Sequence, residues 1–154
     1  MIEHPKTQIK FFAEAGADII TVHYEACAKI LPDYLRETLE LIKSYGVKCG
    51  AVVNPDVPVE NIFPVFPLCD MVLIMSVFPG YGGQKFIESA IEKIKSAREY
   101  AVTIGKPDMD IEVDGGINML TAPRAAAAGA NVLVAGSALF GAPDFAEAVK
   151  KMRG

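Results

Sequence analysis

Residues 13–22 read AEAGADIITV, and residues 126–135 repeat the same pattern as AAAGANVLVA. In both stretches a helical segment ends at a glycine, which suits the left-handed position after a helix C-terminus, and a short apolar strand follows. A third example with different residues, KSYGVK, spans residues 43–48. A helix, a glycine stop, a short link and a buried strand form the αβ half of a βαβ unit. The repeat therefore predicts an α/β protein built from consecutive βα units.

Apolar runs bounded by turn residues predict five strands, and apolar residues at helical spacing fill the gaps between them. We expect strands near residues 18–23, 48–53, 70–76, 109–113 and 131–135. We expect helices after Pro5, over about 32–45 and about 84–103, and shorter ones at 58–67, 119–128 and 143–152. The strands are rich in β-branched residues and alternate little, which is typical of parallel strands covered on both faces. Such a series forms either an open doubly wound sheet or a stretch of a (βα)8 barrel.

Length and composition limit the classes of protein that fit. The chain of 154 residues suits a single domain, residues 1–154, and is shorter than the roughly 250 residues of a complete eight-unit barrel. Its net charge of −4 argues against a nucleic-acid partner, and no apolar run is long enough to cross a membrane. Cys27, Cys49 and Cys69 lack metal-ligand spacing, so we expect three reduced, buried thiols in a cytoplasmic protein.

Two glycine-bearing segments follow predicted strands and are candidates for binding an anion. Gly80, Tyr81, Gly82 and Gly83 follow the third strand, and the pair Gly136-Ser137 follows the fifth. Glycines let backbone N–H groups approach an anion closely, and barrels usually bind phosphate through the loops of their last strands. One such loop is more simply a turn. Two loops at the same rim predict a phosphate site.

An acidic side chain lies between these two loops. In IEVDGG, residues 111–116, a period of two puts Glu112 and Asp114 on one face of the strand. Asp114 stands at the strand's exit beside two glycines that leave space for a ligand. A carboxylate there could ligate a metal or act as a general acid or base, and capping of the next helix is an equally good interpretation. His23 and Met75 also end strands. The simpler interpretation is that His23 is a hydrogen-bonded structural residue and that Met75 belongs to the core.

Four segments together resemble the ribulose-phosphate 3-epimerase family. Residues 75–86, MSVFPGYGGQKF, resemble its M-[ST]-V-x-P-G-[FY]-G-G-Q-x-F signature, and residues 111–116 resemble its IEVDGG. Residues 136–140, GSALF, are similar to its GSA[IL]F loop, and residues 21–26, TVHYEA, to its T-[VF]-H-x-E-A strand end. The four occur in the family's order along essentially the whole chain, which makes the match far more specific than a single glycine-rich loop.

The resemblance implies a (βα)8 TIM barrel of the ribulose-phosphate-binding type that interconverts ribulose 5-phosphate and xylulose 5-phosphate in the pentose phosphate pathway. In that family two aspartates exchange the C3 proton, and a divalent cation (Zn²⁺, Fe²⁺ or Mn²⁺) stabilises the enediolate. The resemblance makes Asp114 one of the two aspartates and a metal ligand. It makes the remaining site residues part of the sugar-phosphate site: Met75, Gly80, Tyr81, Gly82, Gly83, Gly115, Gly116, Gly136 and Ser137.

The sequence also departs from the family's pattern. The H-x-D-x-M-D-G strand and the later H-L-M strand, which carry the other three metal ligands and the partner aspartate, do not occur in it. We therefore expect a partial barrel of five parallel strands, the C-terminal portion of the family's fold, with negligible epimerase activity as an isolated chain. A non-catalytic phosphate-binding fragment and an allulose-6-phosphate 3-epimerase remain alternatives. Unpaired edges on the first and last strands further predict aggregation, self-association as a homo-oligomer, or dependence on a missing N-terminal piece.

Overall fold

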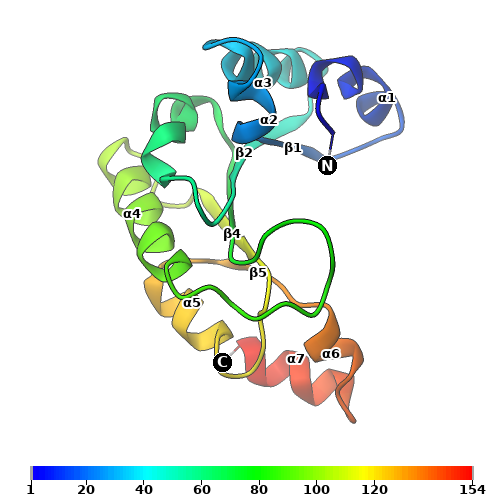
Figure 1. Cartoon of the computed structure of the whole chain (residues 1–154), viewed down its shortest axis with the longest axis vertical. Helices are drawn as coiled ribbons and strands as arrows, with labels where there is room; N and C mark the ends of the chain where they lie inside the picture. Colours follow the sequence, from blue (N-terminus) through cyan, green and yellow to red (C-terminus); the bar gives the residue numbers. More distant parts are fainter. Residues whose placement is uncertain (1, 154) are drawn as a thin grey trace.

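A computed structural model describes residues 2–153, and its strands follow the predicted order (Figure 1). All five lie within one residue of their expected ends, and they pair in parallel in the order β1-β2-β3-β4-β5. Their bounds are β1 Ile19–His23, β2 Lys48–Val53, β3 Met71–Met75, β4 Asp110–Asp114 and β5 Val132–Val134. Because each strand lies next to its successor in the chain, the sheet has the order of a barrel, and the doubly wound alternative is wrong.

The helices connect the strands as the βα pattern predicts. Their bounds are η1 Pro5–Thr7, α1 Ile9–Glu14, α2 Tyr24–Ala28, α3 Tyr34–Ser44, η2 Val59–Leu68, α4 Ala90–Thr103, α5 Ala122–Ala128, α6 Ser137–Phe140 and α7 Phe145–Arg153. The glycine stops at Gly16, Gly46 and Gly129 are confirmed, with φ of +90°, +74° and +116°. None of the helices in the described part of the chain is both long and apolar enough to span a membrane.

Two helix predictions need correction. The helix expected over 84–103 begins at Ala90, because the Ile87 N–H donates to the Ser76 carbonyl (2.8 Å) instead of to a helical carbonyl. Gln84 belongs to the preceding loop, where its side chain donates to the carbonyls of Phe78 (2.6 Å) and Tyr81 (2.9 Å). The helix expected at 58–67 is a 3₁₀ helix that contains Pro64 and Pro67. A proline ring clashes with the carbonyl four residues earlier in an α-helix, and it lacks the N–H that would bind that carbonyl.

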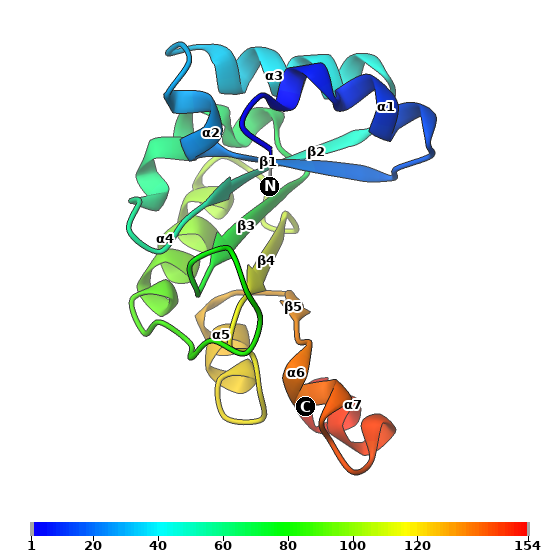
Figure 2. The same ribbon diagram turned by 45° about the vertical axis from the view of Figure 1, so that its right-hand side comes forward.

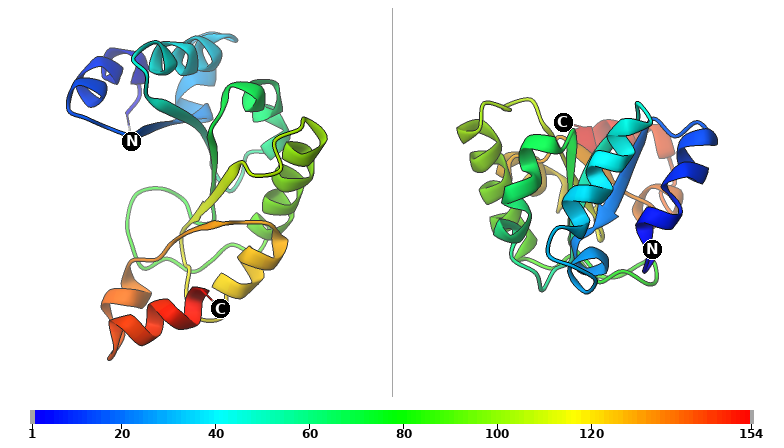
Figure 3. Two further views of the ribbon diagram at one scale, coloured as in Figure 1. Left: turned by 180° about the vertical axis from the view of Figure 1, so that it is seen from behind. Right: turned by 90° about the horizontal axis from the view of Figure 1, so that it is seen from above.

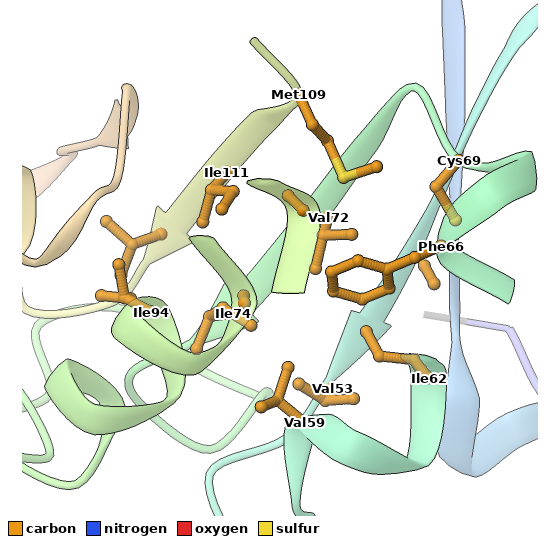
Figure 4. Close-up of a cluster of buried hydrophobic side chains, with 14 of the residues drawn as sticks. Val53, Val59, Ile62, Phe66, Cys69, Val72, Ile74, Ile94, Met109 and Ile111 are labelled. Atoms are coloured by element: carbon orange, nitrogen blue, oxygen red, sulfur yellow. The ribbon is translucent and has the colours of Figure 1, made fainter. Parts of the chain in front are cut away.

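The sheet is strongly curved, and α2, α3, η2, α4 and α5 lie along its convex side, while α6 and α7 follow β5 at one end (Figure 2, Figure 3). The main core fills the space between the convex face and these helices. Phe66, Val72, Ile74, Ile94 and Ile111 are all fully buried there (Figure 4). Burying an aliphatic or aromatic side chain of this size contributes about 1.5–3 kcal/mol, so this layer stabilises the curved sheet.

The concave face carries the alternate residues of each strand. Val52, Leu73, Met75 and Val77 form a small apolar cluster on this face, and Glu112 and Asp114 lie on it beside them in the register of the strands. The prediction of strands covered on both faces holds for β2 and β3 but is wrong for β1, β4 and β5, most of whose residues are only partly buried. Helices cover only the convex side, and on the concave side the small cluster around Val52 and Met75 buries the residues of β2 and β3 alone.

The three cysteines are free and buried, as expected. Burial raises the pKa of the Cys27 and Cys49 thiols to about 11 and that of Cys69 to about 12. Thiols with such values are protonated at neutral pH and behave as small apolar groups. The cysteines therefore belong to the core and not to a site.

Candidate phosphate and carboxylate site

A pocket of about 390 Å³ opens at the carboxyl ends of β3, β4 and β5. Every site residue expected from the sequence lines it, and these residues come from three separate segments of the chain. They are Met75, Gly80, Tyr81, Gly82 and Gly83 from the β3 end, Asp114, Gly115 and Gly116 from the β4 end, and Gly136 and Ser137 after β5. Because parallel strands end at the same edge of a sheet, residues up to 62 positions apart in sequence (137 − 75) meet there.

Ser76 ties the β3 loop to the end of β4. Its side chain is fully buried, and its hydroxyl faces the carbonyls of Gly115 (2.6 Å) and Asp114 (3.0 Å). The Ser76 N–H donates to the Asp114 carbonyl at 2.9 Å, and the Ser76 carbonyl accepts from the Ile87 N–H at 2.8 Å. These bonds fix both ends of the loop over residues 77–86 relative to Asp114. Ser76 was not among the residues predicted for the site, although a hydroxyl directly after an apolar strand indicates such a role.

Packing and backbone conformation both require glycine at positions 115 and 116. Their φ values are +122° and +63°, and a Cβ added to them would lie 2.4 Å from a Val77 methyl and 2.4 Å from the Phe86 nitrogen. The absence of side chains therefore lets the β3 loop lie directly against the end of β4. The sequence predicted room for a ligand at these glycines, and the structure shows that the chain's own loop fills part of that room.

The other glycines of the site face open space. A Cβ added to Gly80, Gly82, Gly83 or Gly136 would meet nothing within 4 Å. Within the described residues, the backbone N–H groups of Gly82, Gly83, Gly116, Gly136 and Ser137 donate no hydrogen bond. Exposed N–H groups that gather around one concavity attract anions with several acceptor oxygens. The pocket can therefore take a phosphate group.

Asp114 is the acid that lines this pocket. It is the last residue of β4, and burial raises the pKa of its carboxyl above the ordinary value. The pKa of Glu112, on the same face of the strand, is also raised, first by burial and then by the charges of Asp114 and Asp110. The helix-capping interpretation of Asp114 is wrong, since the next helix begins at Ala122. A partly buried carboxylate with a raised pKa is suited to accept and return a proton.

Residues 2–153 do not form a complete metal site. No three side chains among their His, Cys, Asp and Glu residues are grouped so that they could hold an ion. Asp114 supplies one carboxylate, whereas divalent cations in proteins usually take at least three protein ligands or a substrate chelate. The described residues therefore do not fit the metal expected from the family resemblance.

Comparison with known proteins supports one family. The family model described as "Ribulose-phosphate 3 epimerase family" matches residues 1–140. The chain is 52% identical over its whole length to ribulose-phosphate 3-epimerase of Bacillus subtilis, and 47% identical over 99% of its length to the chloroplastic ribulose-5-phosphate-3-epimerase of Arabidopsis thaliana. A 3-hexulose-6-phosphate synthase of Salmonella typhimurium has a similar fold, with a TM-score of 0.67 over 97% of this chain and 66% of that protein, at 22% identity.

The matched relatives are longer than this chain. It spans 69% of the Bacillus subtilis protein and 53% of the Arabidopsis thaliana protein. The order of the five strands, the pocket at their carboxyl ends and the match over residues 1–140 agree with one another. This chain belongs to the ribulose-phosphate 3-epimerase family.

Proposed function

We propose that this chain binds the phosphate of ribulose 5-phosphate and supplies one of the two carboxylates that epimerise C3 to give xylulose 5-phosphate. One observation carries the proposal: Asp114 and residues with unpaired backbone N–H groups line the same pocket. The relatives that share most of this chain's length are named for this epimerisation. In the proposed assignment the glycine loops hold the substrate, and Asp114 acts on its carbon chain.

The phosphate would lie between the loop at Gly82-Gly83 and the segment at Gly136-Ser137. Fixed N–H donors hold the phosphate oxygens without side-chain entropy to lose, and the Ser137 hydroxyl adds a further donor. Holding the phosphate places the rest of the sugar phosphate over the concave face, toward Asp114. Such positioning makes the reaction between the carboxylate and the C–H bond effectively unimolecular, which lowers its entropic barrier.

Asp114 would act on the proton at C3. The C3 hydrogen is α to the C2 ketone, so its removal leaves an enediolate, and return of a proton on the other face inverts the stereocentre. Its raised pKa brings the Asp114 carboxylate closer to the working pH, which favours transfer in both directions. Inversion needs a second acid on the opposite face, and Asp114 is the single acid that lines the pocket among the described residues.

Because Asp114 is the single acid that lines the pocket among the described residues, a second candidate function is phosphate binding without turnover. The Zn²⁺, Fe²⁺ or Mn²⁺ that the family resemblance implies would add the Lewis acidity that stabilises an enediolate, but residues 2–153 offer Asp114 and no grouped partners for such an ion. We expect the isolated chain to bind phosphate compounds and to have negligible epimerase activity. We also propose a cytoplasmic location, which the three free, buried cysteines support.

Calorimetric titration with inorganic phosphate and ribulose 5-phosphate tests the binding part. We expect dissociation constants of roughly 1 mM or below, and Gly82→Ala should weaken both, because a methyl group would stand among the N–H donors. Asn61→Ala, a substitution at an exposed position of η2, is the control. If neither compound binds the unaltered chain at about 10 mM, the proposed phosphate site is excluded.

A chimera tests the catalytic part. The part of the Bacillus subtilis relative that this chain does not match is joined to the chain, and turnover is measured with Zn²⁺, Fe²⁺ or Mn²⁺ added. We expect epimerase activity in the chimera and a 10²–10⁴-fold loss in its Asp114→Asn variant, the range typical of a missing general acid or base. Full activity of that variant would exclude Asp114 as the proton-transfer group. Turnover by the isolated chain would contradict the expectation that it is inactive alone.

A further inference from the structure

A second polar cluster lies at the same edge of the sheet, at the ends of β1 and β2. His23 is the last residue of β1, and Asn54 directly follows β2. Glu25 joins them, because one carboxylate oxygen accepts from the Asn54 N–H at 2.7 Å and the other lies 3.3 Å from His23 Nδ1. The His23 and Glu25 side chains are 17% and 18% exposed. The three residues form a partly buried unit outside the phosphate pocket.

Glu25 fixes the orientation of the His23 ring. Burial by itself would raise the pKa of Glu25, but the hydrogen bonds from His23 and from the Asn54 N–H outweigh it and lower that pKa. Glu25 is therefore a carboxylate at neutral pH, and it accepts a hydrogen bond from Nδ1–H. In the neutral ring this leaves Nε2 as an acceptor, and Nε2 has no hydrogen-bond partner among the described residues.

The Asn54 side chain has a second acceptor without a hydrogen-bond partner among residues 2–153. Its side-chain oxygen Oδ1 is buried and finds no donor in the part of the chain that the structure describes. The cation that binds the Asn54 backbone, Lys93, is already occupied: its Nζ donates to the carbonyls of Asn54 (3.0 Å) and Pro55 (2.6 Å) and also to that of Val57. Buried polar oxygens in native proteins nearly always have a partner, so this orphaned oxygen points to a donor that is not part of residues 2–153.

A cavity borders the cluster, and the enclosed Asn54 Oδ1 would have to turn toward it to meet a ligand. This pocket of about 420 Å³ is lined by His23, Glu25 and Asn54 and also by Ile2, Glu3, His4, Ala26, Lys29 and Ile30. His23 also borders a groove along β1 that includes Val52 and Leu73 of the concave face. Neighbouring strands are ~4.8 Å apart, so the ends of β2 and β4, where Asn54 and Asp114 lie, are separated by about 10 Å across the sheet. An extended five-carbon sugar phosphate covers a similar distance.

We propose that His23 Nε2 and Asn54 Oδ1 form a hydroxyl-binding subsite for the sugar chain of the phosphate ester held at the glycine loops. The assignment rests on the proposed phosphate site and deepens it. Both atoms are acceptors, and the hydroxyl groups of a ketose are the donors that they lack. The subsite would distinguish a polyhydroxylated phosphate ester from a simple alkyl phosphate, whereas the glycine loops bind the phosphate group that both have in common.

Calorimetry with two ligands tests the proposal on the chain as it exists. Ribulose 5-phosphate carries hydroxyl groups, and ethyl phosphate carries none. We expect the unaltered chain to bind ribulose 5-phosphate about tenfold more tightly, which is the effect of one to two net hydrogen bonds. His23→Phe and Asn54→Ala should each remove most of this preference and leave the ethyl phosphate affinity unchanged. Asn61→Ala should leave both affinities unchanged.

The outcomes separate the two proposals. Unchanged ribulose 5-phosphate binding by His23→Phe and Asn54→Ala overturns the subsite and leaves the phosphate site standing. An equal loss for both ligands shows general damage to the fold and also counts against the subsite. If neither ligand binds the unaltered chain, the phosphate site fails and the subsite fails with it. Only a selective loss for ribulose 5-phosphate supports the assignment.

Discussion

Asp114 shows how a single functional group lowers the stability of its own site. Its carboxyl is partly buried, lies on the same face as Glu112, and has a pKa raised by burial. A raised pKa means that the folded state favours the protonated acid, so the charged form at neutral pH destabilises the fold. Solvent screening reduces the effect, because Asp114 is only partly buried.

Asp114→Asn is therefore expected to stabilise the chain at pH 7 by about 0.5 kcal/mol. The difference should shrink as the pH falls through the raised pKa and vanish below the ordinary value of aspartate, about 3.9, where both states bind the proton. Urea unfolding at several pH values measures it, with Asp108→Asn at an exposed position as the control. Lower stability of Asp114→Asn at pH 7 would show that the carboxylate makes a favourable contact instead.

Gly115 and Gly82 belong to the same pocket but serve it differently. Gly115→Ala places a methyl group 2.4 Å from Val77 in a left-handed conformation, and we expect a loss of about 2–4 kcal/mol. Gly82→Ala meets no atom within 4 Å and should change the free energy of unfolding by less than about 0.5 kcal/mol. Thermal unfolding of the two variants compares them directly. Equal losses would mean that Gly82 is also needed for packing.

At the scale of the elements, β3 and β5 are each preceded by a residue whose side chain and backbone both bond to the neighbouring strand. Before β5, the Asn131 N–H donates to the Ile111 carbonyl at 3.1 Å, and Asn131 Oδ1 accepts from the Ile111 N–H at 2.7 Å. Before β3, Asp70 makes the same pair of bonds with Cys49, at 2.8 and 2.9 Å. An Asn or Asp side chain thus completes the parallel ladder at the start of the strand, where the backbone alone would leave an N–H unpaired.

Asn131→Ala is expected to destabilise the chain by about 1–3 kcal/mol, because it leaves the Ile111 N–H unpaired and also removes the 2.8 Å bond from Asn131 Nδ2 to Asp110. The measurement is urea unfolding, and Asn61→Ala is the matched control, since that side chain is exposed and takes no part in a ladder. A loss no greater than that of the control would mean that water replaces the side chain at this strand end.

At the scale of the whole molecule, the sheet ends in two open edges. β1 and β5 each pair with one neighbour within residues 2–153, so one side of each strand has unpaired N–H and C=O groups. An apolar groove of about 370 Å³ runs along β1, and another pocket of about 480 Å³ adjoins β5. Open edges next to apolar surface favour pairing with another chain.

We expect the 154-residue chain to self-associate in a concentration-dependent manner, which sedimentation velocity measures. Val132→Lys adds a charge on edge strand β5 and should reduce the association. Val102→Lys adds the same charge at an exposed position of α4 and should leave it unchanged. A monomer at every concentration would contradict the expectation. Equal effects of the two variants would place the contact away from the β5 edge.

The sequence alone determined the βα order, the strand positions, the glycine stops and the family, because each of these depends on residues close together in the chain. A helix end followed by Gly129 and an apolar run specifies a left-handed stop and a strand without distant partners. The motifs also identified Asp114 and the glycine loops, whose residues the fold collects in one pocket.

Only the tertiary structure decided which of these residues touch and which faces are covered. Three features depend on segments brought together by the curved sheet: the close approach of Val77 to Gly115, the unpaired amides around the pocket, and the link from Glu25 to Asn54. The partly exposed concave face depends on them as well. Local patterns report conformation and burial on average, whereas a contact depends on where the rest of the chain lies. That is why the sequence predicted the members of the site, and the fold determined their arrangement.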